Sequence, residues 1–163
     1  MKPASGIAWP DPARRRLLTV PLAAAASPRL GAGGPAAATP AAMTAAIREF
    51  TGGAELRSGR VRFEIAELID NGNAVPVAIR VDSPMTEADH VIAIGIFNER
   101  NPLPDVVRFR LTSRAGKAEV ATRIRLATSQ KLVAVAGMND GTWWQQTVDV
   151  VVTLAACIEG EAS

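Results

Sequence analysis

The sequence is poor in the residues that usually build catalytic and metal sites. Its 163 residues include one cysteine, Cys157, and one histidine, His90. A single cysteine excludes an internal disulfide, and a single histidine excludes a metal site built from several histidines. No phosphate-binding loop or dinucleotide-binding fingerprint occurs. We therefore expect no metal and no bound cofactor, and no convincing set of catalytic residues is present.

The N-terminal region also lacks an apolar run long enough to cross a membrane, which takes about 20 residues. Arg14, Arg15 and Arg16 are followed by a short apolar stretch over residues 17–26. This order, with its Arg-Arg-x-Leu-Leu spacing, predicts a cleavable export signal of the twin-arginine type. A basic, disordered arm is the alternative. The following Ala-, Gly- and Pro-rich stretch extends the predicted signal and linker over residues 1–40.

The excess of positive charge belongs to this leader. The whole chain has 18 basic and 16 acidic residues, and residues 1–40 hold five of the basic ones and one of the acidic ones. The remainder therefore has 13 basic and 15 acidic residues, a net charge of −2. The basic pI is no evidence for nucleic-acid binding. The remaining residues, about 120, suffice for one domain with one core.

The rest of the chain reads mainly as strands. Residues 41–50 are the one good helix candidate, and Gly52 and Gly53 follow them as a cap. The later segments alternate or are continuously apolar, with turn residues between them, which is typical of a β-sandwich. We expect strands over residues 61–65, 75–82, 91–97, 106–111, 118–126, 132–136 and 143–154. The predicted fold is all-β, an immunoglobulin-like β-sandwich of about seven strands over residues 41–154, with a short N-terminal helix.

Four arginines form a candidate binding surface. Arg108 and Arg110 lie two residues apart on one predicted strand, and Arg123 and Arg125 lie two apart on the next. If those strands pair, the four guanidinium groups share one face, which could bind an anion or an acidic partner. The alternative is an ordinary solvated face whose charge is balanced by acidic neighbours.

Two adjacent tryptophans form a second candidate surface. Trp143 and Trp144 point to opposite sides of their predicted strand. We expect one indole to pack in the core and the other to be exposed as a partner contact. The alternative is that the fold covers both.

Cys157 lies in a tail over residues 155–163, just past the last predicted strand, where a thiol is accessible for chemistry. A lone cysteine in an exported chain is either a reactive sulfur or a site of intermolecular pairing. It can also be a packed small apolar residue. A catalytic pair with His90 as base is the remaining alternative, although His90 falls in a polar loop.

Several segments in order resemble the SoxY family, the sulfur-carrier subunits of the periplasmic thiosulfate-oxidising system. The resemblance covers residues 44–157. The matching segments are DNGNAVPV at 70–77, DSPMTEADHV at 82–91, NPLP at 101–104, TRIRLA at 122–127, DGTWW at 140–144 and the cysteine tail.

The resemblance implies a periplasmic, non-catalytic carrier exported by the twin-arginine route. It implies that sulfur intermediates are attached covalently to Cys157, and that the mature chain forms a heterodimer with a SoxZ-like subunit. A c-type cytochrome, a sulfate-releasing hydrolase and a sulfane dehydrogenase of the same system would then act on the attached group. No nucleic acid and no membrane would be partners of the mature form.

The tail departs from the family pattern. The usual tail is Gly-Gly-Cys-Gly-Gly, whereas this chain has Ala155 and Ala156 before the cysteine and Ile158 and Glu159 after it. Alanines restrict the backbone more than glycines do, and nearby carboxylates disfavour a thiolate. This departure favours the second interpretation of the chain, a structural or interaction module whose cysteine is packed or forms an intermolecular disulfide.

Overall fold

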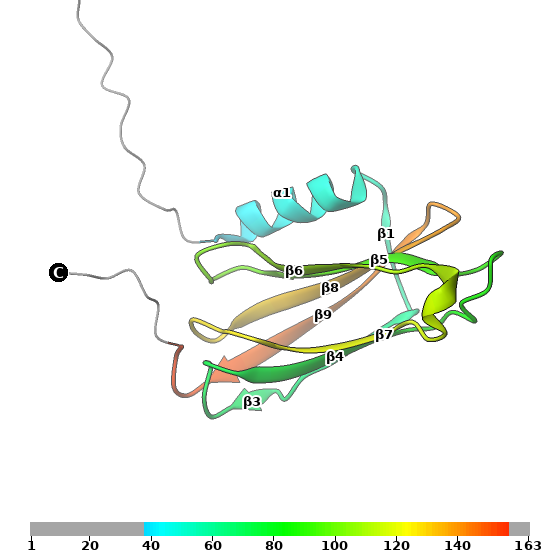
Figure 1. Cartoon of the computed structure of the whole chain (residues 1–163). Coiled ribbons are helices and arrows are strands. Elements are labelled where there is room, and N and C mark those ends of the chain that lie inside the picture. The colour runs from blue at the N-terminus through cyan, green and yellow to red at the C-terminus, as the bar shows by residue number, and fades with distance from the viewer. Residues whose placement is uncertain (1–37, 157–163) are drawn as a thin grey trace, which may run out of the picture. The chain divides into compact units, whose positions relative to one another are not determined.

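The computed structural model of the protein describes residues 38–156. Over these residues the chain forms one α-helix, a short 3-10 helix and nine strands in two sheets (Figure 1). The larger sheet has the strand order β1-β9-β8-β5-β6, with β3 also paired to β9, and the smaller sheet has the order β2-β4-β7. The predicted immunoglobulin-like, all-β sandwich with a short N-terminal helix is confirmed.

The predicted helix is α1 (Pro40–Thr51). Thr39 caps its start, because its hydroxyl accepts a hydrogen bond from the Ala42 N–H, and Pro40 fits the first turn. The helix ends at Gly52, which adopts the left-handed conformation with φ 64° and donates its N–H to the Glu49 carbonyl. Both ends therefore follow from local sequence.

The seven predicted strands are all present, with bounds shifted by a few residues. They are β2 (Val61–Glu64), β4 (Val75–Val81), β5 (Val91–Asn98), β6 (Asp105–Arg110), β7 (Glu119–Ile124), β8 (Gln130–Met138) and β9 (Trp143–Val152). Two further strands were not predicted, β1 (Leu56–Ser58) and β3 (Leu68–Ile69), and both run parallel to β9. Their three and two residues are too few to show an alternating pattern.

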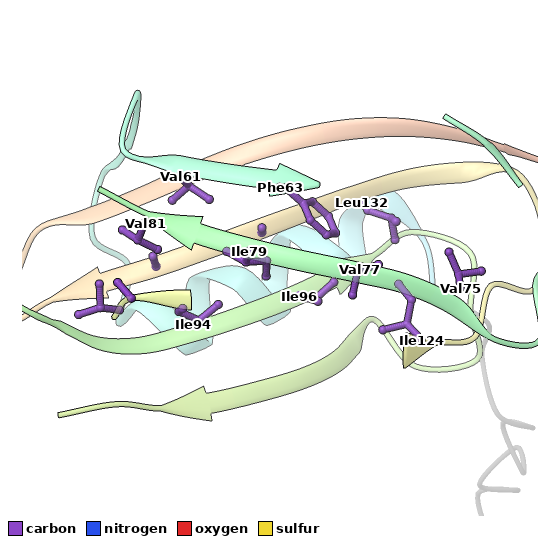
Figure 2. Packing of buried hydrophobic residues seen from close by; sticks show 14 of the residues in the cluster. Val61, Phe63, Val75, Val77, Ile79, Val81, Ile94, Ile96, Ile124 and Leu132 are labelled. Carbon is purple, nitrogen blue, oxygen red and sulfur yellow. The ribbon is translucent and has the colours of Figure 1, made fainter. Parts of the chain in front are cut away.

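The main core lies between the two sheets (Figure 2). The alternation in β4 places Val75, Val77, Ile79 and Val81 on the inner face, and all four are buried. They meet the inner face of the larger sheet, where Ile94 of β5 and its neighbours are fully buried. The period-2 pattern of the sequence therefore identifies the core face of the smaller sheet correctly.

A second, smaller core lies on the other face of the larger sheet, beneath α1. Met43 and Ile47 of the helix pack there with Phe97 of β5 and Val133 and Val135 of β8. This covering helix explains why β5 and β8 are almost continuously apolar, since both of their faces are buried.

The inter-sheet core yields a stability prediction. Ile79 is fully buried, so Ile79→Ala should lower the free energy of unfolding by about 2–5 kcal/mol. Urea denaturation measures this loss. Arg62→Ala, at an exposed position of β2, is the control and should change stability by less than about 0.5 kcal/mol. Equal effects of the two substitutions would show that the inner face has been assigned wrongly.

Candidate functional site

Three backbone segments meet where the chain leaves the sandwich after β9. The Gly72 N–H donates to the Leu154 carbonyl at 2.8 Å, and the Leu126 N–H donates to the Gly72 carbonyl at 2.9 Å. The Ala156 N–H in turn donates to the Leu126 carbonyl at 3.0 Å. We call Gly72, Leu126, Leu154 and Ala156 the tail anchor. It holds the backbone as far as the residue before Cys157.

Gly72 is at the centre of the tail anchor because no side chain fits there. A Cβ atom on this residue would lie 2.3 Å from the Leu126 carbonyl oxygen and 3.0 Å from the Ala156 nitrogen. Both distances are shorter than van der Waals contact, and both neighbours are backbone atoms. The glycine of the Asn-Gly turn is therefore required for the close approach of backbone segments, a role that sequence analysis did not assign.

The Leu126 side of the tail anchor is held by an amide network that includes the buried side chains of Asn98 and Gln130. Asn101 donates from Nδ2 to the Arg125 carbonyl at 2.8 Å, and its Oδ1 accepts the Ala127 N–H at 3.0 Å. Gln130 donates from Nε2 to the same Oδ1 at 2.8 Å, and Asn98, which is fully buried, accepts the Asn101 N–H at 2.7 Å. The Asn-Pro-Leu-Pro segment therefore fixes the loop that holds the tail.

Cys157 itself lies outside the described residues, so its role as attachment point remains a prediction. Its neighbour Ala156 is only 7% exposed and is the last described residue. The described backbone therefore ends at the tail anchor, one residue before Cys157 in the sequence.

His90 lies at the opposite end of the sandwich from the tail anchor. Its N–H donates to Asn139 Oδ1, just past the end of β8 at Met138, whereas the tail anchor lies beyond the start of β8 at Gln130. The nine residues of β8 span about 27 Å at 3.4 Å per step. The fold therefore argues against a catalytic pair of His90 with Cys157.

The strand pairing on which the predicted four-arginine surface depended does not occur. Strand β6 pairs with β5 in the larger sheet, and β7 pairs with β4 in the smaller one, so the two arginine strands do not pair. Arg108 points to the outer face of the larger sheet, where its guanidinium lies over the Phe50 ring at 5.1 Å and pairs with Asp105. The prediction failed because strand pairing is non-local and cannot be read from chain order.

The two arginine pairs are thus separated. Arg108 and Arg110 belong to the outer face of the larger sheet, and Arg123 belongs to the outer face of the smaller sheet, opposite Pro76. Arg125 directly precedes Leu126 of the tail anchor. Only the second pair lies near the tail.

Trp143 and Trp144 point to opposite sides of β9, as predicted, but both are half-buried. Trp143 packs against Phe50 with ring centroids 5.2 Å apart. Trp144 packs at the edge of the inter-sheet core, with the guanidinium of Arg60 5.4 Å from its ring centroid. Neither indole is fully exposed, and a role in partner contact remains a prediction.

Trp144 is oriented by a short polar relay. Its Nε1–H donates to Thr142 Oγ1 at 3.0 Å, and that hydroxyl donates to Asp140 Oδ1 at 2.7 Å. The Thr142 N–H donates to the same carboxylate oxygen at 2.8 Å. These two hydrogen bonds to Asp140 lower the pKa of its carboxyl below the ordinary value, because they stabilise the ionised form.

The described residues contain no group of three or more side chains placed to hold a metal ion. Within the same part of the chain, no helix is long and apolar enough to cross a membrane.

The fold is a two-sheet β-sandwich, and the tail anchor holds its backbone up to Ala156, the residue before the only cysteine in the sequence. A family model described as "Sulfur oxidation protein SoxY" matches residues 47–157. The chain therefore belongs to the SoxY family. Membership gives it a general carrier role in sulfur oxidation and a place in the Sox system.

Solved structures share the fold at low sequence identity. A superoxide reductase (neelaredoxin) from Ignicoccus hospitalis is 18% identical with a TM-score of 0.51, over 57% of this chain and 79% of that one. A superoxide reductase from Nanoarchaeum equitans is 13% identical with a TM-score of 0.50, over 59% of this chain and all of that one. These likenesses show the sandwich fold alone. A search of curated proteins gave no match.

The tail anchor predicts a local effect of one methyl group. Gly72→Ala should push the Leu126 and Ala156 backbones apart and lower the free energy of unfolding by about 1–3 kcal/mol. Because the Ala156 hydrogen bond is broken locally, its amide should exchange with solvent much faster than the amides of β8. Hydrogen exchange followed by NMR measures both rates.

Gly53→Ala is the matched control, since it adds the same methyl group at a glycine with φ 81° that has only Arg48 Cγ, at 4.0 Å, within reach. It should cost about 1–2 kcal/mol through backbone strain and leave the relative protection of Ala156 unchanged. If the exchange rate of the Ala156 amide rose in both variants only in proportion to the loss of global stability, the tail anchor would not be a structure that opens independently of the domain.

The lowered pKa of Asp140 predicts a pH dependence. The ionised carboxylate stabilises the folded chain above the unfolded pKa of about 3.9, and this contribution is lost as the pH falls through the lower, folded pKa. Asp140→Asn should therefore lose less stability between pH 5 and pH 3 than the parent protein does, in urea denaturation. Asp82→Asn, at an exposed carboxyl without these Thr142 contacts, is the control. Parallel stability profiles for Asp140→Asn and the parent would contradict the prediction.

Proposed function

We propose that this protein is the covalent carrier of sulfur intermediates in thiosulfate oxidation, with the Cys157 thiol as the attachment point. The family match supports this, because it extends over residues 47–157 and so ends on this cysteine. The tail anchor also supports it, because the Ala156 N–H to Leu126 bond holds the backbone at the residue before Cys157. This hydrogen bond, which fixes the backbone one residue before Cys157, is the structural observation on which the proposal rests.

The chemistry needs only a thiolate from this chain. Loading joins the Cys157 sulfur to the outer sulfur of thiosulfate, and the two electrons released pass to a c-type cytochrome. Water then cleaves the terminal sulfonate as sulfate in a hydrolase, and a sulfane dehydrogenase oxidises the sulfur that remains. In this scheme the carrier holds and presents the sulfur group, and the partner enzymes catalyse its reactions.

The tail anchor allows the segment that bears Cys157 two lengths, depending on whether the Ala156 hydrogen bond is formed or broken. With the Ala156 hydrogen bond intact, the backbone is held as far as Ala156. If the Ala156 bond opens while Gly72 still holds Leu154, three residues separate the thiol from the domain, a reach of about 10 Å. Opening of this one bond would extend the thiol toward a partner's active site.

The proposal has three further parts. The chain is exported by the twin-arginine signal in residues 1–40, it is located in the periplasm, and it forms a heterodimer with a SoxZ-like subunit. The signal falls outside the described residues. Within the described chain, the half-buried Trp143 and Trp144 are the proposed contacts with a partner subunit.

One observation favours a second function, that of an interaction module whose cysteine is not a carrier. Ala155 and Ala156 stand where the family tail has the glycines that give it conformational freedom. In this alternative Cys157 is packed against the domain or forms a disulfide with another chain. Slow reaction of the native thiol with iodoacetamide, or a reductant-sensitive dimer, would favour it.

The carrier proposal predicts that Cys157→Ser abolishes thiosulfate oxidation in a system reconstituted from the partner enzymes, because serine cannot form the sulfur–sulfur bond. The substitution changes one atom and should leave the melting temperature unchanged. His90→Ala is the control and should retain full activity, since His90 lies at the far end of the sandwich. Retained activity in Cys157→Ser would refute the proposal.

A further inference from the structure

The Asn71-Gly72 pair at the tail anchor combines an asparagine side chain with an unobstructed backbone nitrogen. The nitrogen of the residue after an asparagine can attack the side-chain amide carbon, and a glycine there favours the attack because it has no Cβ to obstruct its nitrogen. Asn71 is the only asparagine in the sequence that precedes a glycine. It is also exposed, so water can reach its amide group.

Two donors from one neighbouring residue hold the side-chain carbonyl of Asn71. Its Oδ1 accepts the Asn73 backbone N–H at 2.9 Å and the Asn73 Nδ2–H at 3.0 Å. When a nucleophile adds to the amide carbon, negative charge develops on this oxygen, and donors already in place at such distances stabilise it. The ring closed by the first of these hydrogen bonds contains the Gly72 nitrogen. The turn therefore holds the nucleophile, the carbon it attacks and the donors for the developing charge.

The tail anchor opposes this attack. Gly72 is buried, its N–H donates to the Leu154 carbonyl at 2.8 Å, and its carbonyl accepts the Leu126 N–H at 2.9 Å. The attack needs the Gly72 nitrogen to lose its proton and to turn toward the Asn71 side chain. The first hydrogen bond retains that proton, and the two together fix the peptide groups on both sides of Gly72. Reaction at Asn71 therefore requires local opening of the tail anchor.

From these contacts we infer that Asn71 is a site of spontaneous deamidation whose rate is controlled by the tail anchor. When Leu154 separates from Gly72, the freed nitrogen gives its proton to water and forms a bond to the Asn71 amide carbon. The Asn71 Nδ2 takes a proton from water and leaves as ammonia, and water then opens the cyclic imide at one of its two carbonyls. No electrons are transferred and no co-reactant except water is needed. The inference does not depend on the role of Cys157.

The two products of imide opening differ in their effect on the tail anchor. Attack of water at the side-chain carbonyl leaves an aspartate at position 71 and restores the main chain. Attack at the main-chain carbonyl leaves isoaspartate, which lengthens the main chain before Gly72 by a methylene, about 1.5 Å. The anchor has no room for such a shift, since even a Cβ on Gly72 would lie 2.3 Å from the Leu126 carbonyl oxygen. Isoaspartate therefore prevents the anchor from closing again, whereas aspartate adds only a charge.

Mass spectrometric peptide mapping of the purified full-length protein, incubated at mildly alkaline pH, measures the rate at Asn71. Deamidation in the folded protein should be at least about tenfold slower than in concentrated urea, because only the open fraction of the anchor reacts. Ala156→Pro removes the N–H that bonds Leu126, loosens the neighbouring Leu154 and should raise the rate by about three- to tenfold. Equal rates in the folded and the urea-unfolded protein, or no deamidation in either, would overturn the inference.

The matched control is Ile79→Ala, which lowers global stability through the inter-sheet core and leaves the tail anchor intact. Its deamidation rate should stay close to that of the parent protein. If Ile79→Ala accelerated the reaction as much as Ala156→Pro does, the modification would follow global unfolding and the anchor would have no control over it. Hydrogen exchange of the Gly72 amide, measured by NMR in the parent and in both variants, should rank the three proteins in the same order as deamidation does. A different order would also contradict the inference.

Two further variants separate the parts of the inference. Asn73→Ala removes the Nδ2 donor and should slow deamidation of the folded protein by about twofold or more, with no change in urea, where the turn is absent. Asn71→Asp reproduces the aspartate product and should keep the slow exchange of the Ala156 amide, whereas the isoaspartate fraction of the aged parent protein should lose it. An isoaspartate fraction with parent-like Ala156 protection would show that the modification does not open the tail anchor.

Discussion

The hydrogen bond from the Ala156 N–H to the Leu126 carbonyl is the contact on which the candidate site depends. It fixes the point at which the chain leaves the sandwich, and it needs Gly72 beside it, since any side chain there would strike the Leu126 oxygen. The amide network around Asn101 keeps the Leu126 loop in place from the other side. One backbone bond therefore ties the domain to the residue that precedes the only cysteine.

This arrangement suits a protein that presents a group and leaves the chemistry to others. The two-sheet core and the covering helix form a well-packed base, and the tail anchor holds the backbone at Ala156, the residue before the cysteine. A single weak bond can close or open without disturbing the sheets, because it joins loop residues and not strand residues.

Sequence patterns predicted the fold well where the signal is local. The alternation in β4 identified its buried face, and α1 was recognised from its composition and its glycine cap. The strands β1 and β3 were missed because they are too short for a pattern and exist only by pairing with β9. The site was only partly predictable: Cys157 stands out by its isolation, whereas the role of Gly72 and the separation of the arginine pairs depend on contacts between distant segments.

The central claim is that Cys157 carries a sulfur group. Intact mass spectrometry of the mature protein, isolated from its native compartment during thiosulfate oxidation, tests this claim most directly. The account predicts a mass increase that maps to Cys157, matches a sulfane or thiosulfonate adduct and disappears on treatment with a reductant. A bare thiol under the same conditions, one that also fails to react with iodoacetamide in the folded protein, would contradict the account and leave a packed cysteine in an interaction module.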